Sequence, residues 1–369
     1  MLKNPLVVGV RQLPPGVHDK YVEHALLDLG NNTGNMVFTE ALLRALGGAR
    51  WGSFSFAPEE LEGRDSIVIA AANWINSYDD FGWLAAHLER VDLPVFLVGV
   101  GAQASTSMEY PEVQPGTLRL LQLVADRSVS IAARGTFSCE VMEHYGIKSA
   151  IPTGCPSLTL VGREGPRIRP VEELSFETSA MHATRHLFSS TDDLQTYLYR
   201  QAYANGADLI LQSELADMYF ALGRRNNPEI IARALPTLEK VYGEPNTDAI
   251  TQYLTAHAKV FMNFTSWIEY MRTKSFCFGS RIHGTVASIA AGTSATLIAH
   301  DSRTLEMARS MNIPYIPASD VSIDKPLRLE DFYVPDQFER LRAGYAEYFA
   351  RFMGYFAQNG LPIANDYQI

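Results

Sequence analysis

The segment FGSRIHGTVASIAAG (residues 278–292) combines a guanidinium and an imidazole at the start of an expected helix. A short apolar strand ends at Gly279, and if the backbone then stays extended, Arg281 and His283 point to the same face. Free N–H groups and the helix dipole favour an anion there. The dipole contributes only roughly 0.3–1 kcal/mol, so Arg281 must provide most of the anchoring. Gly284 leaves room for a ligand to approach the backbone. The segment predicts an anion site; the competing interpretation is a surface ion pair and a hydrogen-bonded core histidine.

A second arginine stands at an equivalent place in the first half of the chain. Arg134 follows an expected strand at 129–133 and precedes an expected helix at 137–145. Because ligands of parallel sheets bind at the carboxyl ends of the strands, Arg134 could offer a second guanidinium to the same anion from across a cleft. The alternative is a salt bridge on the rim of a domain.

The segment GNNTGN (residues 30–35) leads into a helix that we expect from Met36. Glycine and asparagine tolerate positive φ, and successive N–H groups in such loops form nests for anions. Gly30, Asn31 and Asn35 are therefore candidates for an acceptor or phosphate loop. No Gly-Lys-Ser/Thr follows, which excludes a Walker loop. The alternative is an ordinary capping turn with Thr33 or Asn35 as the cap.

Two further strand exits carry weaker signals. GVGAQ (99–103) is lined with glycine, and Gly101 joins the candidate loop, but the third glycine of a dinucleotide fingerprint is missing, so a nicotinamide cofactor is not supported. Asp301 and Arg303 follow another expected strand and could reach the ligand. Asp301 or Ser302 could equally cap the next helix, and we favour capping.

The pattern of apolar residues predicts the elements that position these side chains. Continuous apolar strands alternate with amphipathic helices, which indicates parallel sheets covered on both faces. In the first half we expect strands at 6–10, 66–72, 93–100 and 129–133, with helices at 36–46, 81–88, 118–124 and 137–145. After a polar linker at 162–170 we expect strands at 207–212, 275–278 and 295–299. The helices of that half are expected within 227–272 and at 285–291, 305–311 and 336–358.

The predicted fold class is α/β, with two Rossmann-like parallel-sheet domains that face a cleft, as in GT-B enzymes. The expected domains are residues 1–162, an acceptor side that contributes Arg134, and residues 171–330, a donor side that carries SRIHG. Residues 331–369 are expected to form a C-terminal helix that packs across both domains.

Composition narrows the classes of partner. The 369 residues carry 31 Lys and Arg against 41 Asp and Glu, a net charge of −10, which argues against nucleic acid as the main partner. The three cysteines are far apart, and no H-E-x-x-H or Asp-x-Asp motif occurs, so neither a disulfide framework nor a metal is implied. No apolar stretch is long enough to cross a bilayer, and the N-terminus does not resemble a signal peptide, so we expect a cytoplasmic location.

These segments together resemble the polysaccharide pyruvyl transferase family. The most specific match is GSRIHGTVASIAAGTSATLIAHDSRTLEMARSMNIP (279–314), and GNNTGN, GVGAQ, the segment 134–138 and TGCPSL (153–158) follow the family's order. Three positions differ from the family: Asn35 stands where Asp is usual, Arg303 where Lys is usual, and Gly135 where an acidic residue is common.

The resemblance implies phosphoenolpyruvate as donor and a sugar as acceptor, whose two hydroxyls become bridged by a pyruvate ketal. No other cofactor is implied. It assigns the donor to Arg134, Ser280, Arg281, Ile282, His283 and Gly284. Arg281 and His283 would be catalytic, with a histidine that titrates near neutrality as proton donor or acceptor. Which arginine holds the carboxylate and which the phosphate stays open.

Several alternatives remain at this stage. The acceptor could be a polysaccharide, a glycolipid or a nucleotide-linked precursor in exopolysaccharide and cell-envelope synthesis, with or without a peripheral contact to a lipid-linked precursor. The chain could form a homo-oligomer. A GT-B glycosyltransferase that uses a nucleotide sugar, or a catalytically silent binding subunit of a polysaccharide assembly system, would fit the same fold.

Overall fold

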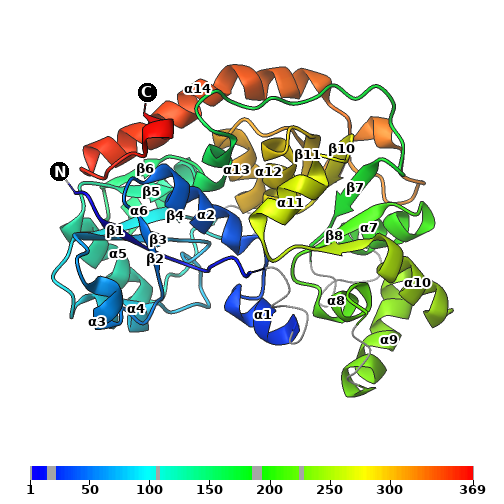
Figure 1. The fold of residues 1–369 in the computed structure, drawn as a ribbon, viewed down its shortest axis with the longest axis horizontal. Helices are drawn as coiled ribbons and strands as arrows, with labels where there is room; N and C mark the ends of the chain where they lie inside the picture. The colour runs from blue at the N-terminus through cyan, green and yellow to red at the C-terminus, as the bar shows by residue number, and fades with distance from the viewer. Residues whose placement is uncertain (1, 15–21, 105–108, 185–192, 224–227, 369) are drawn as a thin grey trace.

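The computed structural model describes residues 2–14, 22–104, 109–184, 193–223 and 228–368. They form two α/β domains that lie side by side, and a long C-terminal helix runs along both (Figure 1). Each domain is built on a sheet of six parallel strands. The expected fold class is therefore confirmed.

The N-terminal sheet has the strand order β2-β1-β3-β4-β5-β6. Its strands are β1 (Pro5–Val8), β2 (Arg50–Gly52), β3 (Ser66–Ala70), β4 (Val95–Val100), β5 (Ile131–Ala133) and β6 (Ala150–Pro152). The helices of this domain are α1 (Val22–Asp28), α2 (Asn35–Ala45), α3 (Pro58–Leu61), α4 (Gly82–Leu88), α5 (Pro115–Arg127), α6 (Thr136–His144) and the 3-10 helix η2 (Pro156–Val161).

The C-terminal sheet has the order β12-β11-β10-β7-β8-β9. Its strands are β7 (Ser179–His182), β8 (Asp208–Leu211), β9 (Ala258–Val260), β10 (Phe276–Gly279), β11 (Ser294–Ala299) and β12 (Tyr315–Pro317). The helices are α7 (Leu194–Ala204), α8 (Leu215–Ala221), α9 (Pro228–Tyr242), α10 (Thr247–His257), α11 (Phe264–Met271), α12 (Ile282–Ala290), α13 (Ser302–Ser310), α14 (Pro335–Gln358) and the 3-10 helices η4 (Ala318–Asp320), η5 (Leu329–Asp331) and η6 (Asn365–Tyr367).

The strand orders show where each sheet changes direction. In the C-terminal sheet the order read from β9 is the Rossmann pattern, and its switch point lies between β7 and β10. In the N-terminal sheet the switch point lies between β1 and β3. Open α/β sheets bind ligands in the crevice beyond such points. The loops that follow β3, β7 and β10 are therefore the ones to inspect for a site.

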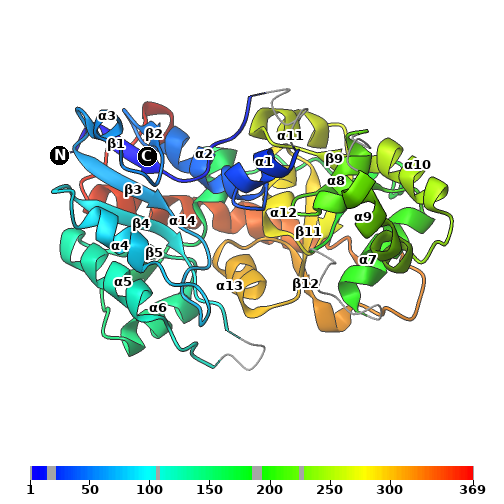
Figure 2. The same ribbon diagram turned by 90° about the horizontal axis from the view of Figure 1, so that it is seen from below.

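Helix α14 ties the two domains together. It runs along the N-terminal domain and reaches the nearer part of the C-terminal domain (Figures 1 and 2). Tyr348 of this helix donates a hydrogen bond to the Cys155 carbonyl at 2.6 Å, while Arg351 donates to the Ser310 carbonyl at 2.7 Å. Near its end, Asn359 accepts from the N–H groups of Val129 and Ser130. The helix thus contacts both the N-terminal domain and α13 of the C-terminal domain.

The sequence predicted most of the long elements within a few residues, but it missed the short strands β2, β6, β7, β9 and β12. Strand β7 is only four residues long, SAMH, and has two polar members. Strand β9 has three residues and lies inside a stretch that we expected to be helical. The other correction concerns α12, which begins at Ile282 rather than near Thr285. Only Arg281 is extended, and His283 already lies in the first helical turn.

Candidate functional site

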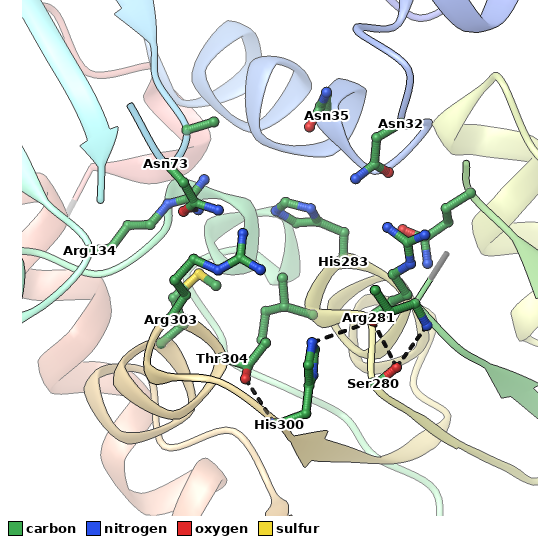
Figure 3. Close-up of a pocket in the computed structure, with 15 residues that line it drawn as sticks. Asn32, Asn35, Asn73, Arg134, Ser280, Arg281, His283, His300, Arg303 and Thr304 are labelled. Atoms are coloured by element: carbon green, nitrogen blue, oxygen red, sulfur yellow. Dashed lines mark hydrogen bonds between the residues drawn. The ribbon is translucent and has the colours of Figure 1, made fainter. Parts of the chain in front are cut away.

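A cavity of about 120 Å³ lies where the two domains meet. Figure 3 shows its labelled side chains converging from α2, from the exits of β3 and β5, and from the first turns of α12 and α13. The lining residues are Asn32, Asn35, Ala72, Asn73, Arg134, Thr184, Gln212, Ser280, Arg281, Ile282, His283, His300, Arg303, Thr304 and Met307. Both arginines singled out from the sequence, and His283, are therefore brought to one place.

Arg281 is the N-cap residue of α12, and it is held by acceptors from the neighbouring strands. Its Nε donates to the Ala183 carbonyl at 2.9 Å, and its Nη2 donates to Oε1 of Glu214 at 2.5 Å. The side chain of Glu214 is fully buried, so this is a buried ion pair rather than the surface pair considered from the sequence. No described residue accepts a hydrogen bond from Nη1 of Arg281, which leaves that donor for a ligand.

Glu214 was missed by sequence reasoning although it orients Arg281. It follows β8, and its second oxygen accepts from the N–H groups of Gln212 and Ser213 at 2.7 and 2.9 Å. A carboxylate that accepts two main-chain bonds and one guanidinium bond has its lone pairs satisfied, which is the condition for burying it. A single glutamate after a short strand has no sequence signature, so only the fold reveals this role.

His283 is buried beneath the cavity and is neutral in the ligand-free chain. Its Nε2 lies 3.7 Å from Sγ of Cys155, and its ring packs against Phe38 with the centroids 5.4 Å apart. Burial, with the charges of Arg134 and Arg281, lowers the pKa of His283 to about 3. The expectation of a histidine that titrates near neutrality is therefore wrong for this state, because two cations and little water surround the ring.

His182 explains the two glycines of the segment GSRIHG. This fully buried histidine accepts from the Arg281 N–H at its Nδ1, at 3.1 Å. A Cβ on Gly279 would lie 1.7 Å from the His182 carbonyl oxygen, and a Cβ on Gly284 would lie 2.6 Å from Cδ2 of the ring. Gly284 does not line the cavity. Its lack of a side chain makes room for His182, which corrects the prediction that it makes room for a ligand.

Arg134 carries a buried charge with only neutral acceptors around its guanidinium. Its Nε donates to the Gly99 carbonyl at 2.8 Å, Nη1 donates to Oδ1 of Asn73, and Nη2 lies 3.5 Å from the Ala71 carbonyl. No described carboxylate lies within ion-pair distance of it. Burial lowers the pKa of Arg134, yet an arginine keeps its proton in proteins. The charge of Glu306 partly opposes the effect of burial, although the two side chains form no ion pair. A buried cation without an ion pair, in a cavity between two domains, is a strong site for an anion.

Gly101, placed in the candidate loop from the sequence, serves Arg134 rather than a ligand. A Cβ there would lie 2.8 Å from Cδ of Arg134. Gly101 does not line the cavity. Because Gly101 has no side chain, the Arg134 side chain can pass beside it and reach the cavity.

The segment GNNTGN does not form an anion nest. The N–H groups of residues 30 to 35 all donate hydrogen bonds within the protein. Four of them, from residues 30, 31, 32 and 35, donate to main-chain carbonyls of the loop and α1. The N–H of Thr33 donates to the Gln212 carbonyl at 2.9 Å, and that of Gly34 donates to Oδ1 of Asn32. Gly30 and Asn31 shape the turn with φ of 62° and 59° and do not line the cavity. The expected caps are also wrong, since Gly34 occupies the N-cap position of α2. What reaches the cavity is the side chains of Asn32 and Asn35.

Gly34 lies where the two domains approach each other closely at the site. A Cβ there would lie 2.7 Å from Oε1 of Gln212 and 3.0 Å from Nδ1 of His283. Because its φ is −60°, this glycine is required for the close approach and not for its conformation. The signal was present in the sequence as the second glycine of GNNTGN, but its reason is tertiary.

Asp301 caps the helix as the favoured interpretation predicted, whereas Arg303 reaches the cavity. Asp301 is the N-cap of α13 and forms a capping box with Thr304. Although burial opposes it, the neighbouring Arg303 lowers the pKa of Asp301 to about 2, so the pair is ionised. Nε of Arg303 donates to Asp301 at 2.8 Å, and the guanidinium lines the cavity while Asp301 does not.

Three polar atoms around the cavity are buried without a partner in the described part of the chain: Nε2 of Gln212, Nδ1 of His300 and Oγ1 of Thr33. Gln212 and His300 line the cavity. Buried donors without acceptors are costly, so their presence at one cavity indicates groups that a ligand would satisfy. Neither Gln212 nor His300 was predicted as a site residue from the sequence.

The described residues contain neither a cluster of metal ligands nor a membrane-spanning helix. No group of three or more His, Cys, Asp or Glu side chains there could hold a metal ion. No helix in the described ranges is long and apolar enough to cross a membrane.

Comparison with known proteins gives the following matches. The family profile described as polysaccharide pyruvyl transferase matches residues 32–302. No curated protein matches the chain. Among solved structures, a UDP-N-acetylglucosamine 2-epimerase from Rickettsia bellii is similar at 10% identity over 96% of this chain and 100% of that chain, with a TM-score of 0.35. The glycotransferase of kitacinnamycin is similar at 12% identity over 95% and 85% of the two chains, with a TM-score of 0.31.

Proposed function

Since the chain belongs to the polysaccharide pyruvyl transferase family, we propose that it moves the enolpyruvyl group of phosphoenolpyruvate onto two hydroxyls of an acceptor sugar. The observation that carries the proposal is the buried Arg134, which forms no ion pair and shares a small cavity with Arg281, His283 and the N-terminus of α12. A donor with a phosphate and a carboxylate suits such a site, because guanidinium groups and helix N-termini are the preferred partners of both anions.

The size of the cavity supports a small donor. At about 120 Å³ it is smaller than the roughly 150 Å³ cavity that holds benzene and far below the roughly 300–1,000 Å³ of pockets for drug-sized ligands. A three-carbon phosphate is compatible with that scale after small adjustments. A nucleotide sugar is too large for this volume, so the cavity favours phosphoenolpyruvate over the nucleotide sugar of a GT-B glycosyltransferase.

We assign the phosphate to Arg134 and the carboxylate to Arg281. The phosphate carries the larger charge and leaves with it, so it belongs beside the cation that has no ion pair. Arg281 is already paired with Glu214 and offers an oriented donor at Nη1. Free N–H groups at the start of α12 add to the site, because no described residue accepts from the N–H of Ile282 or His283.

The reaction balances without a cofactor. The methylene carbon of the donor accepts a proton and becomes a methyl group, and a sugar hydroxyl attacks the cationic central carbon. The C–O bond to phosphate then breaks, and the second hydroxyl attacks the same carbon to close the ketal. Of the two hydroxyl protons, one balances the new methyl group and the other leaves on the phosphate.

His283 is the proposed base for the attacking hydroxyl. A neutral imidazole at physiological pH accepts a proton, and the transition state supplies negative charge nearby that stabilises the imidazolium. The low pKa of the free site means that the base is available before the donor binds. The proposal places the reaction in the cytoplasm.

The test is to incubate the protein with phosphoenolpyruvate and a panel of sugar acceptors, and to measure phosphate release and a mass gain of one pyruvyl group. The His283→Gln variant should lose roughly 10²–10⁴-fold in kcat, because that is the usual contribution of a positioned base. His144→Gln, an exposed histidine of α6, is the control and should keep full activity. Release of a nucleotide from a sugar nucleotide would establish the glycosyltransferase alternative, and acceptor binding without any turnover would establish the silent subunit.

A further inference from the structure

Aromatic side chains gather on the N-terminal domain next to the cavity. We call Phe54, Trp74, Tyr78, Phe81 and Trp83 the aromatic surface. Trp74 stacks on Phe81 with the ring centroids 4.5 Å apart, and Phe54 lies 6.3 Å from Trp74 and 6.0 Å from Trp83. Tyr78 is 64% exposed and Trp83 48% exposed, which is unusual for large aromatic residues. No described ring lies parallel to either of them, so their faces are not covered by stacking.

The loop that carries this surface is held in one conformation. The buried Asn76 donates to the Asn73 carbonyl at 2.8 Å, and its Oδ1 accepts from the N–H groups of Tyr78 and Asp79. Gln114 also donates to the Ser77 carbonyl. A loop that already holds exposed aromatic rings in place loses less conformational entropy when a ligand binds to it. The exposure of Tyr78 is thus built into the fold.

The loop that carries Trp74 and Tyr78 begins at the cavity. Asn73 lines the cavity and binds Arg134, and Trp74 is the next residue. The Tyr78 hydroxyl donates to Gln103 at 2.7 Å, close to where Ser302 of α13 donates to the Ala104 carbonyl across the domain boundary. Partial burial raises the pKa of Tyr78, and Arg303 and Asp301 of the cavity region also act on it. A ligand in the cavity could therefore extend directly onto these rings.

The charge beside the aromatic surface selects the kind of ligand. The same loop carries Asp79 and Asp80, both exposed, which would repel the phosphates of a nucleotide or a lipid diphosphate. Their carboxylates can accept hydrogen bonds from sugar hydroxyls. A pyranose ring offers a face of C–H groups that packs against an aromatic ring, whose face is electron-rich. Acids beside aromatic rings suit a neutral sugar.

We propose that the aromatic surface binds neutral sugar rings of the acceptor chain and directs its hydroxyls into the cavity. This inference rests on the proposed function for its biological meaning. The aromatic surface would bind a glycan whether or not the protein turns over a substrate. It implies that the acceptor has at least one sugar beside the one that is modified, as in an oligosaccharide or polysaccharide.

The experiment measures glycan binding in the absence of phosphoenolpyruvate. The whole protein is screened on an array of neutral and anionic oligosaccharides, and the affinity for the best neutral oligosaccharide is measured by calorimetry. Trp83→Ala and Tyr78→Ala should each weaken that affinity by roughly tenfold, since an aromatic contact of this kind contributes about 1 kcal/mol or more. Trp83→Phe should stay within about threefold, because it keeps a ring.

The matched control is Val129→Ala. Val129 is 59% exposed and precedes the amino end of β5, whereas the loop with Trp74 and Tyr78 follows the carboxyl end of β3, so its truncation should leave binding unchanged. Unchanged glycan affinity in Trp83→Ala, a preference for uridine diphosphate over every neutral oligosaccharide, or no glycan binding at all would overturn the inference. If a glycan binds through these rings but phosphoenolpyruvate is never consumed, the proposed function fails and the binding surface stands.

Discussion

The two walls of the cavity hold their positive charge in different ways. On the C-terminal wall, Arg281 and Arg303 are each paired with a carboxylate, Glu214 and Asp301. On the N-terminal wall, Arg134 is bonded only to neutral oxygens. A paired guanidinium is oriented but largely compensated, while an unpaired buried one keeps its full charge.

This difference shows how a binding site can be stable and can still attract anions strongly. The paired arginines are held in place by their carboxylates, and they present donors in a fixed direction. The unpaired arginine is a local cost of folding that a bound anion would relieve. The walls also differ beyond the cavity, because the N-terminal wall continues into aromatic rings and acids.

The strongest test of this comparison removes each charge in turn. Arg281→Met should lower the free energy of unfolding by about 3–5 kcal/mol, because it leaves Glu214 buried without its partner. Arg134→Met should cost only about 1–3 kcal/mol, from acceptors left without a donor. Urea unfolding of both variants measures the difference. Equal losses, or a larger loss for Arg134→Met, would break the comparison.

The contact between the walls can be tested at Gly34. Gly34→Ala should lower the free energy of unfolding by about 1–3 kcal/mol, because its Cβ would press on Gln212 and His283 from the opposite wall. It should also raise the KM for phosphoenolpyruvate. Gly354→Ala is the control, since a Cβ there meets nothing within 4 Å. If both glycine variants behave alike, the walls do not meet as described.

Inhibitors sharpen the assignment of each wall to one end of the donor. Arg134→Lys should weaken inhibition by inorganic phosphate by roughly tenfold, and Arg281→Lys should weaken inhibition by pyruvate by a similar factor, because a lysine cannot reproduce the planar fork of an arginine. Inhibition constants for both compounds on both variants give the answer. The reverse pattern would exchange the roles of the two arginines, and a wild-type KM for phosphoenolpyruvate in Arg281→Lys would remove that residue from donor binding.

The smallest expected effect is on the pH dependence of the free energy of unfolding. The pKa of His283 is about 3 in the folded chain against an ordinary 6.5, so the unfolded chain binds more protons between these values, and stability falls as the pH is lowered from about 6.5 towards 3. His283→Gln should therefore lose less stability than the wild type between pH 7 and pH 5.5, by roughly 1 kcal/mol. Chemical unfolding at the two pH values measures this. His144→Gln should follow the wild type, and a His283→Gln variant that did so too would show that the ring is not held neutral.

Particular residues show how far the sequence could be used. Arg281 and His283 were predicted because a strand exit with two basic side chains before a helix has few uses, and the cavity contains both. Glu214, Gln212 and His182 were not predicted. Each acts through a contact with a residue that is distant in the chain, and periodicity carries no information about such contacts.

Alternating apolar strands and helices were enough to predict two parallel-sheet domains, because burial on both faces leaves a local pattern in the residues themselves. Which arginine is paired, why Gly34 and Gly284 have no side chain, and why His283 is neutral depended on packing between segments. Electrostatic and steric effects act through space over a few ångströms, so they emerge only when the two domains are brought together.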